Sequence, residues 1–217
     1  FQTGITYDNA INVSGGNSED GYANLSINNV ARDFIIDQDE SKRTSVALRA
    51  GKKIGNFTLD ASIQYISSVI KNGGGSLYGD LLQGATNIPV ADYSDGLNET
   101  HWNGYFLNPY WKVNNIRNFS YSDRINSNFT AAYKINDNIN IKSTASLYSS
   151  TAHGYNYNNG YVDPSYIADL SGYTRTETSS YGANTSSYRT LYGDVVASFE
   201  YPLIKDLSLS ANLGAAT

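Results

Sequence analysis

Apolar and polar residues alternate along several stretches of this 217-residue chain, and this pattern restricts its possible folds more than any other feature. Leu59 and Ile63, for example, alternate with Asp60 and Gln64. Successive side chains of a β-strand point to opposite faces, so a period of two predicts strands with one apolar and one polar face. The pattern recurs at residues 128–135, 139–147, 191–201 and 207–213, and more weakly at residues 11–13, 23–27 and 46–50. We therefore predict about eight antiparallel strands and no long helix.

The connections between the predicted strands differ in length in a regular way. Short turns are predicted at residues 16–20, 53–56, 136–138 and 202–206. Longer connections alternate with them, at residues 31–42, 66–124 and 150–187. One rim of the sheet then carries tight turns and the other carries large loops. Transmembrane barrels have short periplasmic turns and long extracellular loops, whereas soluble domains rarely carry two such long insertions on one edge. Within the longest loop, residues 77–82 are predicted to form a short helical turn.

The composition favours a sheet that has one face in lipid. Charged residues make up 16% of the chain and hydrophobic residues 40%, both below the averages of soluble domains. Lipid offers no partner to a backbone N–H or C=O group, so strands cross a membrane only in a closed barrel. We therefore predict an all-β fold, an antiparallel transmembrane β-barrel. A soluble sheet whose apolar face packs on a core explains the alternation equally well, but it explains neither the loop lengths nor the low charge.

Each predicted strand has one set of residues for the lumen and another for lipid. The residues expected to face the lumen are Asp60, Gln64, Lys134, Lys142, Asp194 and Glu200. The residues expected to face lipid are Leu59, Ile63, Ile141, Leu147, Val195 and Leu209. Barrels place aromatic girdles near strand ends, where the ring meets lipid and the hydroxyl meets water. The expected girdle residues are Tyr22, Phe57, Tyr65, Tyr133, Tyr148, Tyr188 and Tyr201.

The sequence offers little that could form a catalytic site. It has no Cys, which excludes disulfides and thiolate metal sites. Both histidines, His101 and His153, fall in long predicted loops, and no Gly-x-Ser-x-Gly elbow is present. We predict no enzyme activity, no cofactor and no metal site; the candidate that comes nearest is the acidic cluster Asp37, Asp39 and Glu40, whose oxygens suit Ca²⁺ but match no EF-hand loop. The net charge of -5 and the scattered basic residues disfavour nucleic-acid binding.

The longest predicted loop carries side chains that suit ligand binding. Aromatic faces stack on sugar rings or peptide backbones, and Asn side chains both donate and accept hydrogen bonds. The candidate ligand-binding residues are Tyr93, His101, Trp102, Tyr105, Tyr110 and Trp111. The alternative is that these side chains pack the loops onto each other and onto a plug.

Several phrases resemble the SusC/RagA family of TonB-dependent outer-membrane transporters. They are Phe1-Gln2-Thr3-Gly4, the glycine-rich turn at residues 12–17, Tyr22-Ala23-Asn24-Leu25-Ser26, Ser41-Lys42-Arg43-Thr44, Asn108-Pro109-Tyr110-Trp111 with Asn114 and Asn115, and Asp123-Arg124. Their order and spacing match over most of residues 1–149, and beyond that point only the general barrel pattern remains. Many members have a glycine where this chain has Arg32-Asp33-Phe34, so the loop there is expected to differ.

The resemblance implies that residues 1–217 form part of a larger, plugged 22-stranded barrel in the outer membrane of a Gram-negative cell. It implies uptake of an oligomeric nutrient, a glycan or a peptide, beneath a SusD-like surface lipoprotein. Coupling to the TonB complex would involve an N-terminal part that these residues do not include. Two other functions stay open: a complete small barrel that acts as an adhesin or passive channel, and a soluble carbohydrate-binding β-sandwich.

Overall fold

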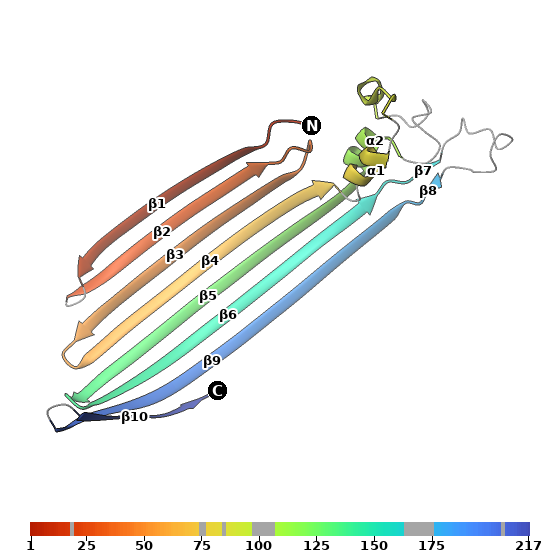
Figure 1. Ribbon diagram of the computed structural model, residues 1–217. Helices are drawn as coiled ribbons and strands as arrows, with labels where there is room; N and C mark the ends of the chain where they lie inside the picture. Colours follow the sequence, from red (N-terminus) through yellow and green to blue (C-terminus); the bar gives the residue numbers. More distant parts are fainter. Residues whose placement is uncertain (18–19, 74–76, 84–85, 97–106, 163–175, 205–206) are drawn as a thin grey trace.

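The computed structural model describes residues 1–17, 20–73, 77–83, 86–96, 107–162, 176–204 and 207–217. Eight strands form one antiparallel sheet, in which each strand pairs with the next one along the chain (Figure 1). They are β1 (Ile5–Asn17), β2 (Gly21–Asp33), β3 (Glu40–Ile54), β4 (Phe57–Gly73), β5 (Ile116–Asn136), β6 (Ile139–Asn158), β9 (Ser180–Ile204) and β10 (Leu207–Ala216). The predicted all-β antiparallel fold is confirmed.

The remaining elements are short and lie in the long connections. Between β4 and β5 are α1 (Leu77–Gln83), the 3-10 helix η1 (Val90–Tyr93) and α2 (Pro109–Asn115). The helical turn predicted at residues 77–82 is thus confirmed. Between β6 and β9, β7 (Tyr161–Val162) pairs with β8 (Thr176–Glu177). All of them lie at one end of the sheet, and the tight turns lie at the other (Figure 1). No helix among the described residues is long and apolar enough to span a membrane.

The bounds predicted for the two long loops, 66–124 and 150–187, are wrong. β4 continues to Gly73, and β5 begins at Ile116. β6 likewise continues to Asn158, and β9 begins at Ser180. In these extensions polar residues such as Ser67, Asp123 and Thr151 occupy positions on the face that is apolar elsewhere. The alternation that marks a strand in the sequence is therefore lost, although backbone pairing continues. The strands of 17–25 residues in β4, β5, β6 and β9 are much longer than the 9–11 residues that cross a bilayer.

The sheet is a single layer in the part of the chain that the structure describes. Substantial contacts within it join only hydrogen-bonded neighbours, and no second sheet packs on either face. The chain exposes 14433 Å², whereas a compact globular protein of its 23.7 kDa mass would expose about 9,800 Å². The two buried hydrophobic side chains among the described residues, Leu107 and Trp111, precede β5 and belong to no strand. A soluble β-sandwich, with its core between two sheets, does not fit this arrangement.

Successive hairpins are staggered along the sheet. Tyr22 pairs with Gly51, and β3 continues three residues further, to Ile54, before it turns. In the same way Phe57 pairs with Tyr133 while β5 continues to Asn136, and Ile139 pairs with Phe199 while β9 continues to Ile204. Every step goes in one direction. Such a stagger is the shear that a sheet needs to curve into a barrel.

The register places all six residues predicted for the lumen on one face. Asp60 pairs with Thr130, Thr130 with Thr144, and Thr144 with Asp194. Since side chains alternate along a strand, the other lumen-facing candidates, each an even number of residues from one of these, share this polar face. Leu59, Ile63, Ile141, Leu147, Val195 and Leu209 share the opposite, apolar face. The apolar face is open: Ile63 is 48% exposed and Leu191 is 73% exposed.

Three of the tyrosines predicted for the aromatic girdles lie on the polar face instead, so that part of the prediction is wrong. The hydroxyl of Tyr22 donates a hydrogen bond to the carboxylate of Asp60 at 2.5 Å. The rings of Tyr148 and Tyr188 lie 5.9 Å apart on the same face of β6 and β9. A position near a strand end does not decide which face a tyrosine occupies, because the phenol finds partners on either side.

Candidate functional site at the loop end of the sheet

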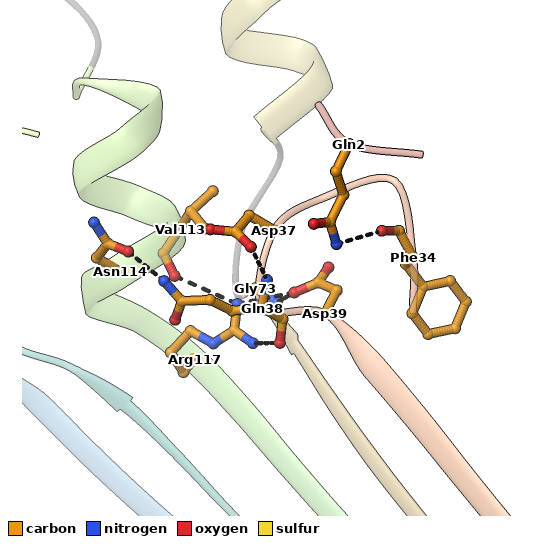
Figure 2. Close-up of polar contacts among 9 residues, drawn as sticks. All are labelled: Gln2, Phe34, Asp37, Gln38, Asp39, Gly73, Val113, Asn114 and Arg117. Carbon is orange, nitrogen blue, oxygen red and sulfur yellow. Dashed lines mark hydrogen bonds and ion pairs between the residues drawn. The ribbon is translucent and has the colours of Figure 1, made fainter. Parts of the chain in front are cut away.

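The end of the sheet that carries α1 and α2 is assembled around a buried arginine. Arg117, the second residue of β5, is 3% exposed. Its guanidinium donates to Asp39 Oδ1 at 2.8 Å, and also to the carbonyl oxygens of Gln38 and Val113. The backbone N–H of Gly73 donates to the same Asp39 oxygen at 2.7 Å. Figure 2 shows that these contacts join the β2–β3 loop, the end of β4 and the start of β5 at one point.

The β2–β3 loop takes a special conformation around this arginine. Gln38 has a φ of 65°, in the left-handed region that non-glycine residues seldom adopt. Its backbone N–H is bonded to Asp37, and its side-chain amide donates to Asn114 Oδ1 in α2 (Figure 2). The backbone N–H of Gln2 donates to the carbonyl of Ile35, and its side chain donates to that of Phe34. The loop is therefore tied both to α2 and to the segment before β1.

The phrase Asn108-Pro109-Tyr110-Trp111 forms the start of α2. Asn108 is completely buried and caps the helix, because its side-chain oxygen accepts a hydrogen bond from the backbone N–H of Tyr110. Its side-chain nitrogen donates to the carbonyl of Tyr93, the last residue of η1, at 2.9 Å. Pro109 takes the first helical position, where its missing N–H costs nothing. Trp111 is only 9% exposed, which favours the alternative that it packs the loop.

Replacing Asn108 with alanine is expected to loosen α2 and η1 together. Loss of the cap costs about 1–2 kcal/mol, and the same substitution leaves the carbonyl of Tyr93 without this donor. Hydrogen exchange of the Tyr110 amide should accelerate by one to two orders of magnitude. Asn108→Ser is the matched control: its hydroxyl oxygen can still cap the helix without adding a buried charge, so it should keep most of the protection at Tyr110. Equal exchange in both variants would show that the cap does not hold the helix.

The two long connections are joined at their bases. The backbone N–H of Asn159, just after β6, donates to the carbonyl of Asn115 at 3.1 Å. The side-chain amides of the same two residues are bonded at 2.9 Å. The hydroxyl of Ser179, just before β9, donates to the carbonyl of Asn159. Residues that adjoin β5, β6 and β9 thus meet at one rim of the sheet. Loops held by a rigid sheet commonly bind ligands at such a rim.

A cleft of about 400 Å³ lies between the 34–39 loop, α1, η1 and α2. Its lining is mainly apolar, and its polar groups come from Asp37, Ser94 and Asn114. Of the candidate ligand-binding residues, Tyr110 lines this cleft, and it is 36% exposed. Tyr93 lies in η1 next to the Asn108 contact. His101, Trp102 and Tyr105 fall outside the described residues, so their assignment stays a prediction.

Two of the three carboxylates in the acidic cluster at residues 37–40 are paired with cationic side chains. Asp39 is bound to Arg117, and Glu40 to Lys71 at 2.7 Å and Lys42 at 3.6 Å. The hydrogen bond from Lys71 lowers the pKa of Glu40 below its usual value. Among the described residues no three His, Cys, Asp or Glu side chains are grouped so as to hold a metal ion. The carboxylates of Asp39 and Glu40 therefore stabilise the loop end of the sheet through ion pairs within the protein.

Comparison with known proteins shows which solved structures share the fold of this sheet. No protein-family model and no curated protein matches the chain. Among solved structures, the RagAB peptide transporter aligns with 100% of the chain at a TM-score of 0.65 and 15% identity. The eight-stranded sheet shares the fold of a part of this transporter. The ferric-catecholate import receptor Fiu of E. coli K12, in its closed form, aligns with 98% of the chain at a TM-score of 0.56 and 15% identity.

The likeness concerns a part of those larger proteins. The chain spans 24% of the RagAB transporter chain and 30% of the Fiu receptor chain. A second structure of RagAB, the peptide importer in its "closed-closed" state, aligns over 99% of the chain with the same TM-score of 0.65. The predicted fold class and the resemblance to the SusC/RagA barrel are thereby confirmed at the level of the fold.

Proposed function

We propose that the chain forms barrel wall and extracellular loops of an outer-membrane receptor that imports an oligomeric nutrient. The observation that carries this proposal is the single sheared sheet, which has one polar and one open apolar face and all its long connections at one end. On this view lipid covers the apolar face. The polar face, with Asp60, Lys142 and Asp194, meets water or a plug in the lumen.

The edges of the sheet support a barrel larger than these eight strands. β1 and β10 lie at opposite edges and do not pair with each other in the described structure. Unpaired strand edges are untenable in hydrocarbon. We infer that further strands cover both edges, as in a 22-stranded plugged barrel. A complete small barrel acting as an adhesin or passive channel would instead require β1 and β10 to close on each other.

The substrate and partners follow from the loop end and the fold. The residues that we propose for ligand contact are Tyr93, His101, Trp102, Tyr105, Tyr110 and Trp111. Of these, Tyr110 lines the cleft beside α2. We propose a glycan or peptide as the nutrient, a SusD-like surface lipoprotein above the rim, and TonB as the source of energy. The similarity in fold to a peptide transporter and an import receptor supports uptake over catalysis.

The test is whether uptake through this protein depends on TonB. A strain that lacks the gene is grown on oligopeptides or on oligosaccharides as the sole carbon source, beside a strain depleted of TonB. We expect both strains to lose growth on the same one of these sources and to keep growth on the corresponding monomers. Growth that needs the gene but not TonB would contradict the proposal and favour a passive channel, and growth that needs neither would favour an adhesin.

A further inference from the structure

A group of aromatic side chains continues the apolar face beyond the end of its apolar region. We call it the ring cluster; it consists of Phe119, Tyr121, His153, Tyr155, Tyr157 and Tyr181. The register makes them direct neighbours: Tyr121 lies opposite His153, Phe119 opposite Tyr155, and Tyr157 opposite Tyr181. They come from β5, β6 and β9, on the same face as Phe129 and Leu147.

The rings of the cluster are stacked against each other. The centroids of Tyr121 and His153 are 4.8 Å apart with an interplanar angle of 8°, and those of Phe119 and Tyr155 are 4.5 Å apart with an angle of 13°. Tyr155 and Tyr181 continue the stack at 6.3 Å. The cluster is not a core, since Tyr181 is 72% exposed. Side-by-side stacking between strands leaves ring edges, with the tyrosine hydroxyls, to face outward.

A polar row separates the ring cluster from the apolar region. Ser67, Asp123, Thr151 and Ser187 are successive partners across β4, β5, β6 and β9. Below this row lie Ile63, Ile125, Phe129 and Leu147. Tyr133 marks the other end of the apolar region on β5, twelve positions after Tyr121. At the usual rise and tilt of a barrel strand, twelve residues cover about 30 Å along the membrane normal, which is more than the apolar band of about 25 Å. The ring cluster therefore begins where the hydrocarbon ends and extends toward the loops.

Positive charge borders the ring cluster. Lys71 on β4 lies opposite Phe119, and Lys42 on β3 lies nearby, with Glu40 shared between them. Arg189 on β9, at the edge of the apolar region, has no ionic partner among the described residues. Glu40, and Asp123 in the polar row, offset two of these three cations, so this border carries an excess of one positive charge in a chain whose net charge is -5. Cations beside aromatic rings at a membrane surface suit phosphate groups and sugar rings.

We propose that the ring cluster, with Lys71 and Arg189, binds the phosphorylated saccharide head group of a glycolipid in the outer leaflet. This inference rests on the membrane placement proposed above. The ring cluster continues the face that lipid covers, and for this reason a membrane glycolipid fits the cluster better than a soluble sugar does. Tyrosine hydroxyls bind saccharide hydroxyls, ring edges and faces cover sugar C–H groups, and the two cations bind phosphate.

The test measures lipopolysaccharide held by the complete barrel protein. The protein is inserted into vesicles of phosphatidylethanolamine and phosphatidylglycerol that also contain lipopolysaccharide, extracted, washed, and assayed for lipopolysaccharide per barrel. Removing rings in a variant that combines Tyr121→Leu, His153→Leu and Tyr155→Leu should lower retention about tenfold, a loss typical of several aromatic contacts. The matched control combines Tyr148→Leu and Tyr188→Leu, which removes a ring pair from the polar face of the same sheet and should leave retention unchanged.

A second variant, which changes the side chains less, provides a test even if the first variant does not fold. Tyr155→Phe, Tyr157→Phe and Tyr181→Phe together keep the rings and remove three hydroxyls, and retention should fall about threefold. Folded barrels that retain as much lipopolysaccharide as the wild type in both variants, or that bind phospholipid equally well, would overturn the inference. Failure of the wild-type protein to enter the vesicles at all would instead contradict the proposed membrane placement.

Discussion

Replacing Arg117 with alanine is expected to destabilise the loop end of the sheet by about 3–5 kcal/mol, the usual result of removing one partner of a buried ion pair. The substitution leaves the buried carboxylate of Asp39 without its cation, and it removes the donor to the carbonyls of Gln38 and Val113. Hydrogen exchange in residues 38–40 and in α2 should accelerate strongly, while exchange near the tight turns stays unchanged.

Two further variants show whether the buried pair is the cause. Arg49→Ala removes an arginine whose side chain is 64% exposed and is paired with Asp60, so it should cost at most about 1 kcal/mol. Arg117→Met combined with Asp39→Leu removes both charges and should recover part of the protection, because no charge is left buried alone. If Arg117→Ala and Arg49→Ala had equal effects, the buried pair would not organise this end of the sheet.

Introducing arginine at Ala145 is expected to have the second large effect, and the same change one residue earlier should be tolerated. Ala145 lies in the middle of the apolar face, opposite Phe129 and Gly193. An arginine on the lipid face near the bilayer midplane costs about 2–4 kcal/mol. Thr144 lies on the polar face opposite Asp194, so Thr144→Arg gains a neighbouring carboxylate. Denaturant unfolding of the complete barrel in phospholipid vesicles measures both variants.

The difference between these adjacent positions is the informative quantity. Both variants add the same charge to the same strand, so the change in net charge cancels in the comparison. We expect the midpoint of unfolding to fall for Ala145→Arg alone. Equal loss at Ala145 and Thr144 would mean that both faces are dry, and equal tolerance would mean that both faces are wet; either result contradicts a lipid-covered apolar face.

The face that each strand residue occupies could be predicted, because it depends only on whether its position along the strand is odd or even. Asp60 and Asp194 are far apart in the sequence, yet each lies in an alternating stretch, and pairing of the strands puts them on one side. The strand ends could not be predicted in the same way. From Ser67 to Gly73, β4 has no apolar side to alternate, although its backbone remains paired with β5.

The rim could not be predicted because its contacts join distant positions. Asp39 and Arg117 are separated by 78 residues, and no spacing rule connects an acidic loop residue with an arginine at a strand start. The carboxylates at residues 37–40 were only the nearest candidate for a metal site, and in the structure Asp39 and Glu40 are paired with side-chain cations. The phrase around Asn108 carries part of the family resemblance in the sequence, and in the structure it caps and packs α2.

A spin-label scan along residues 57–65 of β4, in vesicles that contain the complete barrel protein, tests the membrane account most directly. Collision rates with oxygen, which concentrates in lipid, and with a water-soluble nickel chelate are measured at each position. We predict oxygen maxima at Leu59, Ala61 and Ile63, and chelate accessibility restricted to the intervening positions. Low collision rates with both reagents at Leu59 and Ile63 would show that protein, not lipid, covers this face, and chelate access there would show that water does.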